Sequence, residues 1–252
     1  MTAIMRRIVQ NNWSKLVAVA LVLNLSITSC SFYEEDLKPS VSGEGVIKTE
    51  SREVEAFSEI ELETNATVYV TEGAETKVQV SAFGNLQPFV QTIVNGKTLI
   101  IDNKRSFRSE DQITIYITVP SVEKLTVRGA GKVISQGVLG TDHLALKVTG
   151  SGEIKVAADA ETIKSDVDGS GTIEVAGHAY SQEVNISGSG KLLSYELLTE
   201  ASQVQIGGSG NAFAQVAKKL DVKITGSGEV KYKGQPTVDT NITGTGRVSQ
   251  LI

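Results

Sequence analysis

Apolar and polar residues alternate along most of the chain beyond residue 45. From 148 to 156, every second residue is apolar or glycine, and the residues between them are polar or charged. This period of two is typical of a β-strand with one buried and one solvent-facing side. In the second half of the chain a Gly-x-Gly triplet recurs seven times, at Gly129 and Gly131, Gly150 and Gly152, Gly169 and Gly171, Gly188 and Gly190, Gly208 and Gly210, Gly226 and Gly228, and Gly244 and Gly246.

The residues around each triplet follow one pattern in every copy. We expect a strand on each side of a tight bend, because apolar residues flank the triplet at equal spacing. Glycine at the bend permits a positive φ and lets successive backbones approach closely, where a Cβ would crowd them. The residues two positions before the first glycine are Val127, Val148, Val167, Ile186, Ile206, Ile224 and Ile242, and those two positions after the second are Val133, Ile154, Ile173, Leu192, Ala212, Val230 and Val248.

The first glycines of successive triplets are 21, 19, 19, 20, 18 and 18 residues apart. This period is too short for a four-stranded propeller blade, and it matches one coil of a β-solenoid. A single coil cannot bury its Val and Ile side chains, whereas coils stacked about 4.8 Å apart pair their backbones and join the apolar rows into one core. The sequence therefore predicts an all-β fold, a single-stranded parallel β-helix with coils of about 18–21 residues. Its handedness and number of faces stay open.

The first half of the domain alternates without the triplet. We expect one β-helical domain over residues 46–252, with an irregular capping part at 46–122 and the Gly-x-Gly repeat part at 123–252. Within the cap, Asn95-Gly96 predicts a hairpin turn between two strands. A short helix can form near Leu86 to Val90.

Residues 1–29 have the composition of a lipoprotein signal peptide. Arg6, Arg7 and Lys15 precede an apolar stretch at 16–27, and small polar residues follow it. This apolar stretch is too short to span a bilayer, which takes roughly 20 residues. We therefore expect the segment to be cleaved.

Cys30 is the single cysteine of the chain and follows Ile27-Thr28-Ser29. This quartet resembles the lipobox of bacterial lipoproteins, in which the thiol is acylated. We therefore expect lipid attachment at Cys30, a flexible tether over residues 30–45, and a cell-envelope location on the outer membrane of a Gram-negative, Bacteroidetes-like bacterium. The acidic residues Glu34 to Asp36 resemble a surface-export signal of Bacteroidetes lipoproteins, and a solvated tether explains them equally well.

Several segments together resemble the head GIN domain family of putative autotransporter adhesins, a bacterial domain family of unknown function. The resemblance runs from about Arg52 to Val248. It rests on residues 52–60, on Asn95-Gly96 followed by Leu99 to Ile101, on residues 115–120 and on the Gly-Ser-Gly series. The resemblance implies a pectin-lyase-like β-helix that turns at Gly-Ser-Gly, and a role in adhesion.

No residue pattern in the sequence indicates a catalytic centre. His143 and His178 lie outside any metal-ligand spacing, and we expect His178 in a surface loop. Asp166 and Asp168 flank Val167 and should point the same way, so they could serve acid-base chemistry or bind a cation. No third acidic residue falls in register with them, and outward charge on an alternating strand is the preferred interpretation.

Binding of the common cofactors finds no support either. The stretch 207–212 partly resembles a calcium-binding repeat, but Ala212 stands at the aspartate position. No triplet extends to a nucleotide-binding glycine motif. The net charge is −5, and without the three basic residues of the signal segment 21 basic and 29 acidic residues remain, a balance of −8. This acidity excludes a nucleic-acid footprint, and we expect no catalytic residue, cofactor or metal.

Three functions fit these observations. The leading one is a non-catalytic envelope lipoprotein whose solenoid flank or end contacts an unidentified protein or glycan in adhesion. The alternative is a structural homo-oligomeric scaffold, because the sequence shows no helix that would cover the last coil, and an uncovered coil leaves an unpaired β edge. A carbohydrate-active enzyme of pectin-lyase-like fold is the third, and it would need clustered acids that the pattern lacks. The ligand, the oligomeric state, and a periplasmic or surface position stay open.

Overall fold

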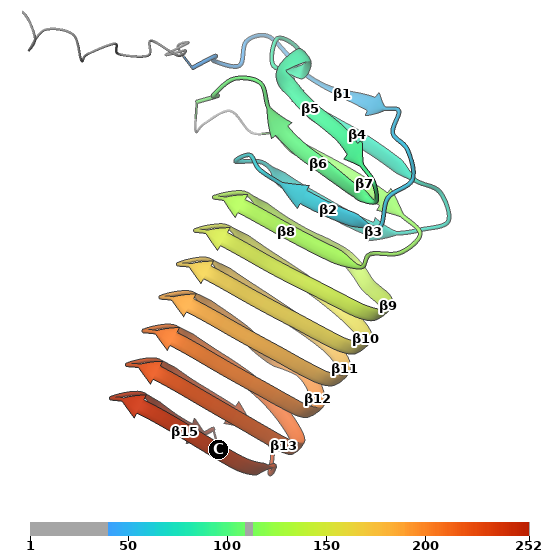
Figure 1. Ribbon diagram of the computed structural model, residues 1–252. Helices are drawn as coiled ribbons and strands as arrows, with labels where there is room; N and C mark the ends of the chain where they lie inside the picture. Colours follow the sequence, from blue (N-terminus) through green and yellow to red (C-terminus); the bar gives the residue numbers. More distant parts are fainter. Residues whose placement is uncertain (1–39, 109–112, 252) are drawn as a thin grey trace, which may run out of the picture. The chain divides into compact units, whose positions relative to one another are not determined.

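The computed structural model describes residues 40–108 and 113–251, which form a β-solenoid of about seven turns. Successive strands stack as coils, each displaced from the one before it along the solenoid axis (Figure 1). The expected all-β solenoid is confirmed. Its regular part consists of five long strands in parallel register, β9 (Lys132–Gly150), β10 (Glu153–Gly169), β11 (Thr172–Gly188), β12 (Lys191–Gly208) and β13 (Asn211–Gly226).

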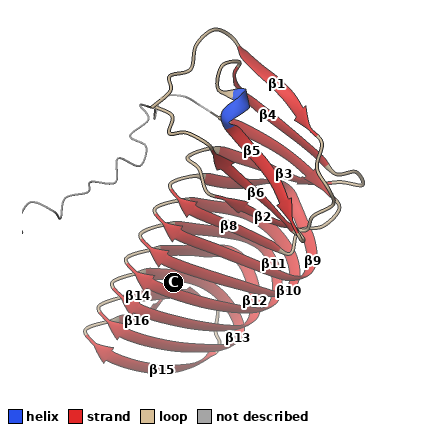
Figure 2. Cartoon of the chain, turned by 45° about the horizontal axis from the view of Figure 1, so that its top comes forward, coloured by secondary structure: helices blue, strands red, loops and turns tan. Residues whose placement is uncertain are grey.

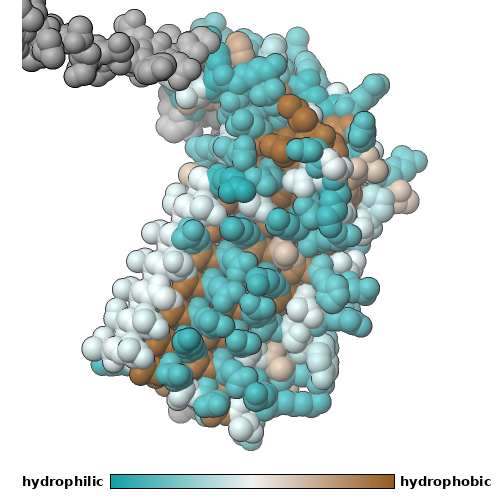
Figure 3. Space-filling model, viewed as in Figure 1, coloured by the Kyte–Doolittle hydropathy of each residue, from teal (hydrophilic) through white to brown (hydrophobic). Residues whose placement is uncertain are grey.

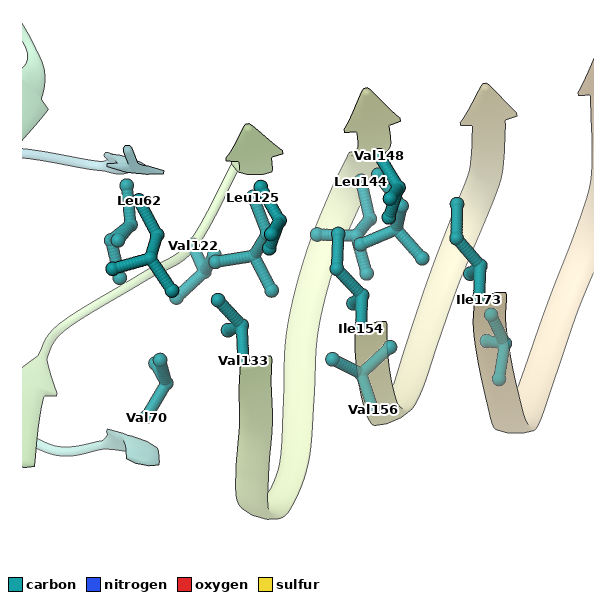
Figure 4. Close-up of a cluster of buried hydrophobic side chains, with 14 of the residues drawn as sticks. Leu62, Val70, Val122, Leu125, Val133, Leu144, Val148, Ile154, Val156 and Ile173 are labelled. Carbon is teal, nitrogen blue, oxygen red and sulfur yellow. The ribbon is translucent and has the colours of Figure 1, made fainter. Parts of the chain in front are cut away.

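Each long strand bends once and covers two sides of the coil. In β10, the even-numbered Ile154, Val156 and Ala158 are buried, and beyond the bend the odd-numbered Ile163 and Val167 are buried instead. We call the part that follows a triplet the first arm (153–158 in β10) and the part that precedes the next triplet the second arm (162–169). Because both arms turn their apolar side chains inward, they share one core (Figure 4).

The core is a set of stacked rows. Val127, Val148, Val167, Ile186 and Ile206 occupy the same position in successive coils and are all buried. Burying one such side chain contributes about 1.5–3 kcal/mol. Burial of each row therefore stabilises the register in which every triplet lies next to the triplets of the neighbouring coils.

The first coils are not stacked in chain order. Strand β2 (Glu59–Leu62) pairs in parallel with both β6 (Thr98–Asn103) and β8 (Lys124–Gly129). Strand β3 (Thr67–Glu72) pairs in parallel with both β7 (Thr114–Val119) and β9. The segment 59–72 thus lies between a coil made of later residues and the first triplet-bearing coil.

Antiparallel strands close this end of the stack (Figure 2). Strand β1 (Ile47–Arg52) pairs with β4 (Lys77–Phe83), and β4 pairs with β7. Strand β5 (Val90–Asn95) forms a hairpin with β6 through Gly96, whose φ is 63°. The short 3₁₀ helix η1 (Gln87–Phe89) lies where the sequence predicts a helix.

The opposite end of the stack consists of shorter strands. Strand β14 (Glu229–Lys233) pairs with β13 and with β16 (Arg247–Gln250), while β15 (Thr237–Gly244) pairs with β13. Among the described residues, no strand pairs with the outer edge of β15 or of β16. Ile242, which belongs to the row of inward aliphatic residues, is 40% exposed there.

Candidate contact surfaces

The Gly-x-Gly triplets form one edge of the solenoid. The first glycine of each triplet has a positive φ, as at Gly169 with 117°, and a Cβ there would stand 2.7 Å from the carbonyl oxygen of Gly150. That same carbonyl accepts a hydrogen bond of 2.9 Å from the backbone N–H of Ser170. The first glycines of all seven triplets share the left-handed backbone: Gly129, Gly150, Gly169, Gly188, Gly208, Gly226 and Gly244.

The second glycine of each triplet has no space for a side chain, and the reason differs from that for the first glycine. A Cβ on Gly171 would lie 2.4 Å from Cγ1 of Val148 in the preceding coil. The same clash with a Val or Ile of the preceding coil recurs at Gly152, Gly190, Gly210, Gly228 and Gly246, whereas at Gly131 the nearest atom is the carbonyl oxygen of Thr64. Both glycine sets are thus explained by coil packing, without a ligand.

A groove with polar walls runs along the outer face of the second arms, and the aliphatic residues Val167, Ile186 and Ile206 also line it. One wall is formed in β9 to β13 by the residues three positions before the first glycine that ends each strand, and these residues stand in register from coil to coil. Figure 3 shows hydrophilic side chains gathered over these strands, beside a column of neutral residues at the glycine edge. We call this set the amide row: Lys147, Asp166, Asn185, Gln205 and Lys223.

The groove has two connected parts. The first has a volume of about 450 Å³ and lies between the amide row and the small residues Ser187, Gly207 and Thr225. The second, of about 840 Å³, continues past Gln205 and Lys223 to the last coil, where β15 borders it. The sequence pattern contains this row, since its spacings equal those of the triplets, but periodicity alone does not tell an open groove from a filled surface.

Asp166 and Asp168 both line the groove, on the outer face of β10. The side-chain nitrogen of Asn185 donates hydrogen bonds to Asp166 Oδ1 at 2.9 Å and to Glu183 Oε1 at 3.1 Å. Lys164 also binds Glu183, at 3.0 Å. The hydrogen bond from Lys164 lowers the pKa of the Glu183 carboxyl, and the same bond raises the pKa of the Lys164 amine. Asp166 thus belongs to a hydrogen-bonded network on this face, together with Asn185, Glu183 and Lys164.

The two histidines lie elsewhere. His178 lies within β11 at the bend between the arms, where it stands opposite Asp159 in the register of the two strands. The prediction that His178 lies in a loop is therefore wrong. The strand continues there because Gly177, with a φ of 111°, bends the backbone without breaking its pairing. His143 is exposed on β9, two strands away from β11. Within residues 40–108 and 113–251, no three His, Cys, Asp or Glu side chains are grouped closely enough to hold a metal ion.

The outer face of the first arms differs from the groove. Its charges form ion pairs along the stack, Lys132 with Glu153 at 2.9 Å and Lys155 with Glu174 at 2.8 Å. Farther along, the rings of Tyr195 and Phe213 pack at 4.6 Å between centroids. Burial raises the pKa of the Tyr195 hydroxyl. The side chains of this face therefore bind mainly to one another.

Two further residues singled out in the sequence are Ala212 and Cys30. Ala212, at the aspartate position of the calcium-like stretch, is fully buried in the core, so its role is packing. The signal peptide and Cys30 lie outside the described residues. In the part of the chain that is described, no helix has the length and apolarity needed to cross a membrane.

Fold and surfaces together define a parallel β-solenoid with long, regularly repeated outer faces. The chain belongs to the family described as "Putative auto-transporter adhesin, head GIN domain", whose model matches residues 56–236. This confirms the resemblance noted in the sequence. No curated protein matches the sequence significantly.

Several crystal structures share the fold. A putative adhesin of Bacteroides fragilis is 22% identical, with a TM-score of 0.77 over 84% of this chain and 100% of the other. A putative adhesin of Parabacteroides distasonis is 21% identical, with a TM-score of 0.71 over 84% and 100%. A putative lipid binding protein of the same species is 22% identical, with a TM-score of 0.67 over 85% and 100%.

Proposed function

We propose that this protein is a non-catalytic, lipid-anchored module of the cell envelope that contacts a partner through the outer surface of its solenoid. Membership of an adhesin domain family is the observation that carries the proposal. The repeated, solvent-facing surface supports it, because stacked coils present an extended contact area. The sequence around Cys30 supports the anchor, since acyl chains on its thiol would hold the domain at a membrane.

Protease shaving of intact cells tests both the anchor and the exposure. We expect external protease to remove the solenoid from wild-type cells, and we expect Cys30→Ala to release the protein from the membrane fraction. Full protection of the wild-type protein, while a known surface protein is digested, would contradict surface display. Retention of Cys30→Ala in the membrane fraction would contradict the lipid anchor.

We propose a structural scaffold as the second candidate. Among residues 40–108 and 113–251 the outer edges of β15 and β16 have no partner strand, and unpaired backbone groups at a sheet edge can pair with another chain. Sedimentation of the full chain over a wide concentration range separates the two candidates. A concentration-dependent dimer would support the scaffold, and a monomer throughout would contradict it.

A further inference from the structure

The groove on the second arms contains side chains that the fold leaves unused. Lys147, Asp168, Gln205 and Lys223 line it, and within the described parts of the chain their side chains make no hydrogen bond or ion pair. Other charged side chains of the stack are paired within the chain, as Lys132 with Glu153 on the first arms and Lys219 with Asp221 on the second. The groove therefore offers donors and acceptors to a molecule outside the chain.

The charges of the groove indicate what kind of molecule it fits. Two lysines and two aspartates line its first part, so their formal charges cancel. A polyanion or a polycation would meet as many like charges as opposite ones, and like charges disfavour binding. Amide and hydroxyl groups, such as those of Gln205 and Ser187, both donate and accept hydrogen bonds. A ligand rich in hydroxyl groups matches this set.

The direction of the groove indicates the shape of the ligand. It crosses the strands, because the amide row takes one residue from each of β9 to β13. With strands about 4.8 Å apart, these four steps span about 19 Å. Small residues, Ser187 and Gly207, border it on the side of the glycine edge. An extended chain lying along the solenoid axis would meet one polar or charged side chain of the amide row at every coil, with the two amides at its centre.

We propose that this groove binds a neutral, extended oligosaccharide. Its central hydrogen-bonding groups are the side-chain amide of Gln205 and Oδ1 of Asn185, because the amide nitrogen of Asn185 already donates to Asp166 and Glu183. Asn185 and Gln205 stand next to each other in register and both line the groove. The inference rests on the proposed adhesion function, for which it names the class of ligand and the binding surface.

Calorimetric titration of the mature protein tests the proposal. The probes are cellohexaose, xylohexaose and mannohexaose as neutral chains, with hexagalacturonate as an anionic chain of similar length. We expect at least one neutral hexasaccharide to bind, and we expect the double variant Asn185→Ala/Gln205→Ala to bind it at least about tenfold more weakly, from the loss of two groups that each contribute about one hydrogen bond. A second variant, Ser187→Arg, fills the exposed side of the groove and should weaken binding similarly.

The matched control is Asn211→Ala/Gln215→Ala, which removes the same two side-chain types from the first arms. It should bind as the wild type does, and circular dichroism shows whether each variant is folded. The proposal is overturned if no neutral hexasaccharide binds, if hexagalacturonate binds more tightly, or if folded groove and control variants have equal affinity.

Attachment of cells to surfaces coated with the same polysaccharides separates the groove from the adhesion function. If deletion of the protein abolishes attachment and Asn185→Ala/Gln205→Ala does not reduce it, adhesion stands and the groove is the wrong surface. If deletion leaves attachment to every surface unchanged, the adhesion function itself is contradicted.

Discussion

Each Gly-x-Gly triplet combines two glycines whose surroundings differ. The first has a left-handed backbone, and the second lies under an aliphatic side chain of the preceding coil. Only the first requirement is local. The second depends on which residue the neighbouring coil places there, so a substitution at the second glycine tests the stacking itself.

We expect Gly171→Ala to destabilise the fold. Its Cβ would stand 2.4 Å from Val148 Cγ1 and 2.8 Å from the carbonyl oxygen of Gly152. Overpacking of this kind costs about 1–3 kcal/mol of unfolding free energy, which urea denaturation measures. Gly140→Ala is the matched control, because the nearest atom to its Cβ is Glu72 Oε2 at 3.6 Å. Equal stability of the two variants would show that the coils are less tightly packed than the structure indicates.

At the scale of elements, the insertion of β2 between β6 and β8 joins three segments that are distant in sequence. Side chains reinforce the junction: Thr98 Oγ1 donates a hydrogen bond to Glu59 Oε2 at 2.7 Å. Lys97 Nζ lies 3.2 Å from Glu59 and 2.8 Å from Glu123. The pKa of the Glu59 carboxyl is lowered, chiefly by the Thr98 hydrogen bond and further by Lys97, against the opposing effect of burial.

This shift makes the junction sensitive to acid. A carboxyl whose pKa is lower in the folded state stabilises the fold above its ordinary pKa of 4.5, and this contribution is lost as the pH falls through the folded value. We expect Thr98→Val to lower the unfolding free energy by about 1 kcal/mol at pH 7, and by less at pH 3. Thr114→Val, at a threonine in β7 outside this junction, should show no such pH dependence in denaturation. A pH-independent deficit in Thr98→Val would refute the assignment.

At the scale of the whole molecule, the solenoid behaves as a stack of nearly equivalent layers. From Glu153 to Gly169, β10 pairs with residues of β11 that lie 19 positions later, without a shift in register. In such a stack each coil interacts with its two neighbours only. A coil of matching length can therefore be added without disturbing distant ones.

We expect a tandem duplication of residues 169–187, inserted after Ser187, to fold. Its unfolding free energy should equal or exceed that of the wild type, and its urea m-value should rise because unfolding exposes more surface. The control insertion carries the same residues in reverse order, which destroys the match between the inserted coil and its neighbours. If both insertions fold equally well, the register between coils does not determine the stability.

The alternation of residues and the paired glycines were enough to predict the solenoid and its coil length, because the period is present in the sequence itself. The Asn95-Gly96 pair predicted the hairpin between β5 and β6, because its turn geometry is local. The coil order at the capped end was decided by tertiary structure alone, because β2 pairs with β6 and β8, which are distant from it in sequence, and β2 carries no repeat that would indicate the pairing. The same holds for the groove. Asp166 was visible as an outward acid, but only the register between coils places it beside Asn185, and Asn185 beside Gln205, with unfilled space next to them.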